Sequence, residues 1–112
     1  MIIVKLFFLM CMVFASFINS SFAQEQTAYT IIIKDHKFSP VQLNVPTGQK
    51  FKLIVDNQDP TPEEFESYPL NREKVVLGGK KILIYLGPLK EGSYEYFGEF
   101  HKQTAKGVIV AQ

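Results

Sequence analysis

The sequence has few of the side chains on which redox, metal and nucleophilic chemistry usually depend. Its 112 residues include no Trp, one Cys, three Met and two His. The only cysteine is Cys11, and Met1, Met10 and Met12 lie in the same opening stretch. Beyond that stretch the chain has no thiol. A cysteine nucleophile, a zinc–cysteine cluster and a thiol redox motif are therefore excluded from the remainder.

An excess of charge of one sign is also missing. Twelve Lys and Arg balance eleven Asp and Glu, for a formal net charge of +1. This balance argues against a nucleic-acid partner and against an acidic disordered tail. No serine lies in a nucleophile-elbow context, and no glycine loop suited to phosphate is present. We therefore expect a single globular domain that is not an enzyme.

The opening stretch differs in kind from the rest of the chain. One charge, Lys5, precedes an apolar run over residues 6–18, and small residues flank Phe22 in Ser21-Phe22-Ala23. This order is typical of a secretory signal peptide cleaved near Ala23. The alternative, a membrane anchor, would need about 20 apolar residues. We expect a leader over residues 1–23 and an exported domain over residues 24–112, periplasmic or secreted and not inserted in a membrane.

Short β-type segments separated by turn residues fill the exported part. The expected strands are residues 29–34, 41–45, 51–56, 65–67, 74–77, 81–86, 93–97 and 107–111. Turn signals such as Pro46-Thr-Gly48, Asp59-Pro60-Thr61-Pro62 and Gly78-Gly79 lie between them. Regular short strands with such breaks predict an all-β sandwich or barrel, and no segment keeps a helical period.

Candidate ligands for a metal are few and partly clustered. Three glutamates, Glu63, Glu64 and Glu66, follow the proline-rich turn. Side chains alternate between the faces of a strand, so an inward Phe65 places Glu63 on its own side and turns Glu64 and Glu66 away. A solvated acidic edge is the alternative for these glutamates, and plain surface exposure is the alternative for the two histidines, His36 and His101.

Several motifs together resemble the cupredoxins, the single-domain Greek-key β-sandwiches of plastocyanin-like and azurin-like proteins. They are Phe38-Ser-Pro40, Leu43-Asn-Val45-Pro-Thr-Gly48, Val55-Asp-Asn57, Lys90-Glu-Gly92-Ser-Tyr94, Phe97-Gly-Glu-Phe-His101 and Gly107-Val-Ile-Val110. The resemblance covers nearly all of residues 28–111. The strings EEFESYPLNREKVV and GEFHKQTAKG are similar to those of small exported cupredoxin-like domains associated with periplasmic iron uptake.

The resemblance also implies where a metal would bind. By position, the family's first histidine ligand falls near Glu63 and its closing histidine on His101. Gly98 stands where the copper-binding cysteine would lie, and Ala105 or Lys106 where the methionine would lie. Because a thiolate gives type 1 blue copper its properties, such a site is excluded.

The ligand candidates that remain at this end are Glu63, His101, His36, Glu66 and Glu99. A mixed imidazole and carboxylate set suits Cu(II), Fe, Mn or Zn, and we expect a copper or iron ion. The resulting hypothesis is a carrier in periplasmic metal acquisition, which would serve a membrane iron or metal transporter or another periplasmic protein. The alternative is a cupredoxin fold that has lost its metal and acts as an adaptor or partner subunit of a transport system.

Overall fold

The structure, a computed structural model, describes residues 25–112. The predicted leader over residues 1–23 lies outside this range. The described elements are β1 (Ala28–Lys34), β2 (Lys37–Ser39), β3 (Gln42–Val45), β4 (Phe51–Asn57), β5 (Glu63–Ser67), β6 (Arg72–Val76), β7 (Lys81–Leu86), β8 (Gly92–Gly98), the 3-10 helix η1 (Glu99–His101) and β9 (Lys106–Ala111). Among residues 25–112, no helix has the length and apolar character needed to cross a membrane.

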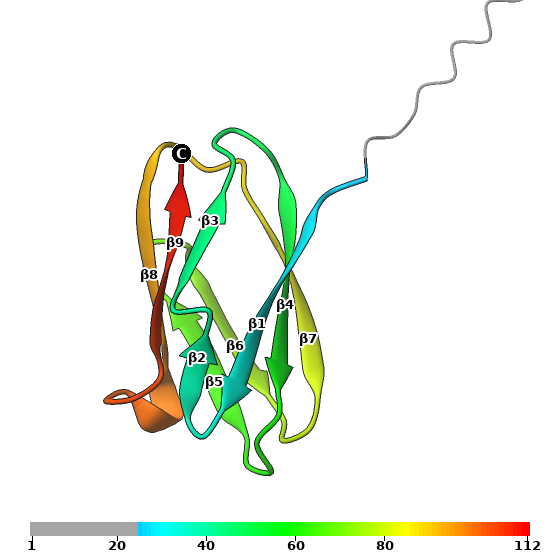
Figure 1. Cartoon of the computed structure of the whole chain (residues 1–112), viewed down its shortest axis with the longest axis vertical. Coiled ribbons are helices and arrows are strands. Elements are labelled where there is room, and N and C mark those ends of the chain that lie inside the picture. The colour runs from blue at the N-terminus through cyan, green and yellow to red at the C-terminus, as the bar shows by residue number, and fades with distance from the viewer. Residues whose placement is uncertain (1–24) are drawn as a thin grey trace, which may run out of the picture.

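Two mixed sheets face each other as the layers of a β-sandwich (Figure 1). The four-stranded sheet has the order β2-β1-β4-β7, and the five-stranded sheet has the order β3-β9-β8-β5-β6. In each sheet one neighbouring pair is parallel, β1 with β4 and β3 with β9. The remaining neighbours are antiparallel. The predicted all-β sandwich is therefore confirmed.

Alternation of buried and exposed residues along the strands forms the core. In β4, Phe51, Leu53 and Val55 are buried, whereas the intervening Lys52, Ile54 and Asp56 are partly exposed. Because successive side chains of a strand point to opposite faces, each strand places one row of apolar side chains between the sheets. Burying these rows removes apolar surface from water. This hydrophobic effect is the main stabilising contribution in a domain of this size without disulfide bonds.

An aromatic cluster fills the middle of the sandwich. Phe38 contacts the edges of the Phe65 and Tyr96 rings, with centroids 6.3 and 5.1 Å away. The Tyr96 hydroxyl donates to the carbonyl of Pro40 at 3.3 Å, which satisfies the one polar group of the cluster. Phe38 belongs to β2, a strand that the sequence patterns did not predict because three residues are too short to show an alternation.

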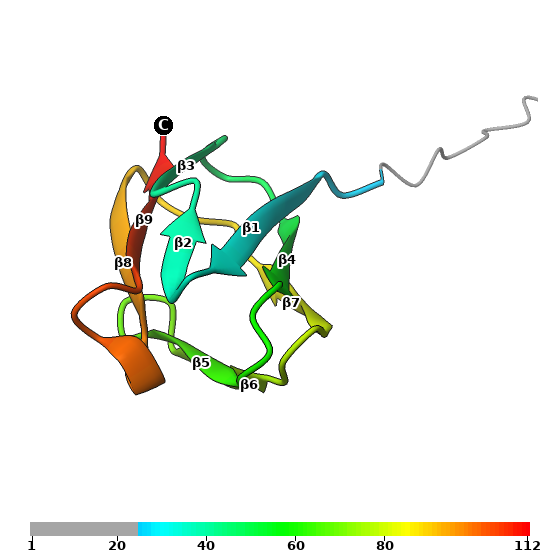
Figure 2. The same cartoon turned by 60° about the horizontal axis from the view of Figure 1, so that its bottom comes forward.

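Three connections meet at one end of the sandwich and build the candidate site. They are the β1–β2 turn, the β4–β5 connection and η1 with the loop that follows it (Figures 1 and 2). In Figure 1 these segments lie at the lower end, opposite the C-terminus. The sequence predicts no strand between residues 97 and 107, and the structure shows a 3-10 helix there, with His101 as its last residue.

Candidate metal centre

The first candidate ligand, His36, lies on the tight turn between β1 and β2. The two strands pair up to Lys34 opposite Lys37, so Asp35 and His36 alone form the connection. Both have positive φ, 52° for Asp35 and 58° for His36. This matches a type I′ turn, whose twist suits a hairpin but whose central positions favour Asn and Gly. The turn holds the imidazole over the end of the sandwich, where 43% of the side chain is exposed.

A carboxylate from the neighbouring connection holds this turn in place. Asp59 accepts hydrogen bonds from the backbone N–H groups of Asp35 at 2.7 Å and His36 at 3.0 Å. Burial raises the pKa of Asp59, but these two N–H groups and the charges of His36 and His101 lower it more, so the net shift is downward. Asp59 is a site residue that sequence reasoning missed. The sequence placed it in a proline-rich turn, and its only signal was a carboxylate at the start of that turn.

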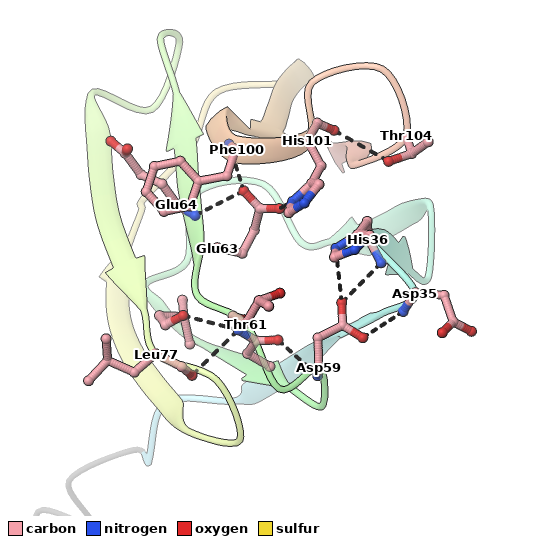
Figure 3. A network of polar contacts seen from close by, with 12 residues as sticks. Asp35, His36, Asp59, Thr61, Glu63, Glu64, Leu77, Phe100, His101 and Thr104 are labelled. Carbon is pink, nitrogen blue, oxygen red and sulfur yellow. Dashed lines mark hydrogen bonds and ion pairs between the residues drawn. The ribbon is translucent and has the colours of Figure 1, made fainter.

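Glu63 lies near the start of β5 and points between the sheets, beside Phe65. Only 1% of its surface is exposed, although glutamate is almost never fully buried without partners. Its Oε1 accepts from the backbone N–H groups of Glu64 at 3.0 Å and Phe100 at 2.9 Å. Its Oε2 lies 2.5 Å from Nδ1 of His101. Every oxygen of this buried carboxylate therefore has a partner (Figure 3).

His101, the last residue of η1, completes the group of candidate ligands with His36 and Glu63. The backbone fixes its position, since its carbonyl accepts from the N–H groups of Thr104 at 3.2 Å and Ala105 at 2.9 Å. Its imidazole contacts Glu63 on one side and stacks on His36, with ring centroids 3.6 Å apart and 14° between the planes. With 30% of its side chain exposed, His101 bridges the buried carboxylate and the surface.

The structure thus brings together three of the five residues that the sequence singled out. His36, Glu63 and His101 each offer one ligand atom, and these atoms lie within 4.8 Å of one another. Parity along β5 explains the choice of glutamate, because Glu63 is on the same face as the fully buried Phe65. The three side chains come from the β1–β2 turn, β5 and η1, which are distant in sequence.

Glu66 and Glu99, the other two residues of the ligand set expected from the sequence, lie outside this group. Glu66 points to the outer face of the five-stranded sheet, where its carboxylate lies with those of Glu64 and Glu73, all within 4.8 Å. Glu99 forms an ion pair with Lys102 at 3.1 Å. The physical reason is the two-residue period of β5, which directs Glu66 away from Glu63.

The outer glutamates influence one another strongly. A hydrogen bond with Glu73 is the largest of several effects that raise the pKa of Glu64 to about 7. The others are burial and the charges of Glu73, Glu66 and Glu99. Burial and a hydrogen bond with Glu99 likewise raise the pKa of Glu66. This patch is an acidic surface next to the candidate centre rather than part of it.

Gly98, where the resemblance implies a copper-binding cysteine, has no room for a side chain unless its neighbours move. A Cβ on Gly98 would lie 2.6 Å from Cδ of Glu63, 2.8 Å from its Oε1 and 2.7 Å from Cβ of Ala105. Gly98 has φ of −94°, a conformation open to every residue, so space alone requires glycine. The carboxylate of Glu63 thus occupies the volume that a side chain at position 98 would need.

Comparison with known proteins agrees with this geometry. Residues 5–111 match the family described as Cupredoxin-like domain. The chain belongs to this family. An uncharacterized protein of Rickettsia prowazekii (strain Madrid E), RP394, is 44% identical over 114 residues, which cover 95% of this chain and 91% of the relative.

Solved structures similar to this cupredoxin-like protein include copper proteins of the same fold. Auracyanin A, described as a blue copper protein of Chloroflexus aurantiacus, has a TM-score of 0.68 at 13% identity, covering 79% of this chain and 100% of its own. Amicyanin of Paracoccus versutus has a TM-score of 0.61 at 16% identity, covering 76% and 81%. A purple cupredoxin of Nitrosopumilus maritimus has a TM-score of 0.57 at 21% identity, covering 74% and 98%. At these identities the likeness concerns the fold.

The donor set of the cupredoxin-like domain fits a transition metal of borderline or hard character. Two imidazoles and one carboxylate offer nitrogen and oxygen donors, which suit Cu(II), Fe or Zn better than Cu(I). Ligand atoms bound to one such metal at about 2.1 Å lie within about 4.2 Å of each other. From the 4.8 Å grouping, the ligand atoms must therefore move slightly closer together, and one of the two stacked rings must turn.

Proposed function

We propose that this cupredoxin-like protein binds a transition metal ion, Cu(II) or iron, through His36, Glu63 and His101. The observation that carries the proposal is the convergence of these three donors at one end of the sandwich. A buried carboxylate that meets an imidazole, with a second imidazole stacked on the first, is an arrangement that packing alone does not require.

The exposure of the donors favours capture and release over permanent storage. Glu63 is buried, whereas the side chains of His36 and His101 are 43% and 30% exposed to solvent. Three protein ligands leave coordination positions for water or for a ligand of a second protein. Such an open site suits an ion carrier, and we propose no enzymatic reaction for it.

The setting that we propose is outside the cytoplasm, after removal of the leader, in the acquisition of a metal such as iron. The order of charge, apolar run and small residues before Ala23 supports export. The strings around Glu63 and His101 support the link to iron uptake through their resemblance to exported iron-uptake domains. A membrane metal transporter, or another protein of that compartment, is the partner that this setting implies.

A second candidate function is a metal-free adaptor, and one observation favours it. The donors satisfy each other without an ion, because Oε2 of Glu63 meets Nδ1 of His101 and both oxygens of Glu63 have partners. A fold that has lost its metal would keep such contacts for stability alone. Fold membership does not decide between the two candidates.

Calorimetric titration of the purified protein with Cu(II) and, without oxygen, with Fe(II) separates them. We expect one ion per chain with a dissociation constant of roughly micromolar or below, and an affinity at least about tenfold weaker in His101→Ala and in Glu63→Gln. Glu66→Gln is the matched control, since it makes the same change three residues further along β5, on its outer face. Binding only in the millimolar range, unchanged by Glu63→Gln, would favour the adaptor.

The titration does not identify the physiological ion, because most nitrogen and oxygen sites bind Cu(II) more tightly than Fe(II). A cellular measurement decides this point. Under iron limitation, cells that lack the protein should accumulate less iron, and the Glu63→Gln variant should fail to restore it whereas Glu66→Gln restores it. An unchanged iron content together with a changed copper content would assign copper as the cargo.

A further inference from the structure

We propose that Asp59 is a positioning residue of the metal centre, whose carboxylate holds the β1–β2 turn and so keeps the imidazole of His36 beside Glu63 and His101, where a turn of the ring brings it onto the ion. This inference rests on the proposed metal-binding function. It assigns a role to a residue outside the group of three candidate ligands.

The first step is the conformation of the turn. Asp35 and His36 both have φ near +55°, at 52° and 58°. For a residue with a side chain, this left-handed region is less favourable than the right-handed one. Histidine at the second central position is therefore unusual, and surrounding contacts must hold it there. The two hydrogen bonds to the Asp59 carboxylate, at 2.7 and 3.0 Å, are those contacts.

The second step is that Asp59 is itself firmly held. Its side chain is 9% exposed, and its own N–H donates to Oδ1 of Asn57 at 3.0 Å. Asn57 is fully buried at the end of β4, and its Nδ2 donates to the carbonyls of Thr61 at 2.9 Å and Val76 at 3.0 Å. The polar network thus connects both sheets to the turn that carries His36 (Figure 3).

The third step concerns the ring of His36. Oδ2 of Asp59 lies 3.5 Å from Nδ1 of His36, a distance at which charge acts although a hydrogen bond would be weak. A carboxylate beside Nδ1 favours the proton on that nitrogen and leaves Nε2 with the free electron pair. Asp59 therefore selects the tautomer as well as the position of His36.

The test compares Asp59→Asn with Asp56→Asn in Cu(II) titrations of the purified protein. Both variants remove one carboxylate charge, but Asp56 is on the outer side of the four-stranded sheet, where its carboxylate accepts a hydrogen bond from the Gln58 side chain at 3.3 Å. Loss of a partner that orients a ligand typically weakens binding by a factor of 10 to 100. We expect at least about a tenfold loss for Asp59→Asn and no change for Asp56→Asn.

A spectroscopic readout separates positioning from a merely structural role. Imidazole nitrogen shifts, measured above the pH range in which histidine titrates, should show the Nδ1–H tautomer of His36 in the unaltered protein and in Asp56→Asn. Asp59→Asn should shift the population toward Nε2–H. An Nε2–H tautomer in the unaltered protein would overturn the inference even if Asp59→Asn fails to fold.

The outcomes distinguish this inference from the proposed function. If His101→Ala loses the metal and a folded Asp59→Asn does not, metal binding stands and the role of Asp59 is wrong. If the unaltered protein binds no ion, the proposed function fails and the inference about metal binding fails with it. The tautomer measurement would then report only whether Asp59 orients the ring.

Discussion

The imidazole of His36 lies flat on that of His101, with ring centroids 3.6 Å apart and planes inclined by 14°. The free electron pair of an imidazole lies in the plane of its ring. Two parallel rings therefore direct their electron pairs along parallel planes and not toward a common point. His36 is the more exposed of the two and is on a turn, whereas His101 is tied to the buried Glu63.

Metal binding should consequently separate the stacked rings, mainly through rotation of His36. Stacked aromatic rings shift each other's proton resonances, and unstacking removes this shift. Zn(II), which is diamagnetic and accepts the same donors, is the suitable probe. Proton spectra should show the ring protons of both histidines moving downfield in a stoichiometric titration. Ring shifts that stay constant while Zn(II) binds would place the ion elsewhere.

Substitutions of His36 should separate backbone strain from metal binding. Both His36→Ala and His36→Gly remove the imidazole, but glycine adopts φ of 58° without penalty and alanine does not. We expect the glycine variant to be more stable than the alanine variant by about 1 kcal/mol in denaturant unfolding. Both should lose metal affinity equally. Equal stability of the two variants would show that the turn relaxes when the imidazole is removed.

Gly98→Ala should destabilise the protein and disturb the candidate centre together. The new methyl group would lie 2.6 Å from Cδ of Glu63, so the carboxylate must leave its place near His101. Forcing a methyl group into a filled interior typically costs about 1–3 kcal/mol. Chemical denaturation checks the stability, and Cu(II) titration checks the centre.

Making the Gly98→Ala substitution in Glu63→Ala protein as well tests whether the collision with Glu63 causes the loss of stability. In Glu63→Ala protein the colliding carboxylate is absent, and of the three nearest atoms Cβ of Ala105, at 2.7 Å, remains to oppose the new methyl group. The Gly98→Ala substitution should therefore cost less in this background than in the unaltered protein. An equal cost in both backgrounds would mean that Glu63 does not limit the space at position 98.

The acidic patch beside the centre should make stability depend on pH. The pKa of Glu64 is raised from its ordinary 4.5 to about 7, so the folded state holds a proton that the unfolded state releases. The contribution of this group is fully present below pH 4.5 and is lost as the pH rises through about 7. Glu73→Gln removes the principal cause, so it should raise the melting temperature above pH 7 and change it little below pH 4.5. A similar rise in melting temperature above pH 7 and below pH 4.5 would contradict the assignment of this pH dependence to Glu64.

Strand patterns predicted most of the fold, because buried and exposed side chains alternate along the strands with a period of two residues. The segment over residues 81–86 has the predicted bounds, and residues 51–56 extend by only one residue, to Asn57. The three-residue strand β2 escaped prediction, since its buried Phe38 has too few neighbours to show alternation. Which strands pair, including the parallel β1–β4 and β3–β9 contacts, depends on interactions far apart in sequence.

The sequence predicted which types of residue form the candidate site, but it predicted less well which individual residues belong to it. Parity on β5 separated Glu63 from Glu66 once Phe65 was placed inside. Glu99 was included because it is close to His101 in sequence, yet its carboxylate pairs with Lys102. Asp59 was missed because its role arises from contacts with residues 24 and 23 positions earlier, which no local pattern reports.

The origin of the three donors gives the site a mechanical consequence. His36 is on a turn of the four-stranded sheet, and Glu63 is on a strand of the five-stranded sheet. An ion bound by both would join the two layers, as a removable cross-link at the open end of the sandwich. Since the donors meet only after both sheets have closed, such a cross-link would form last during folding and would oppose the first separation of the layers under force.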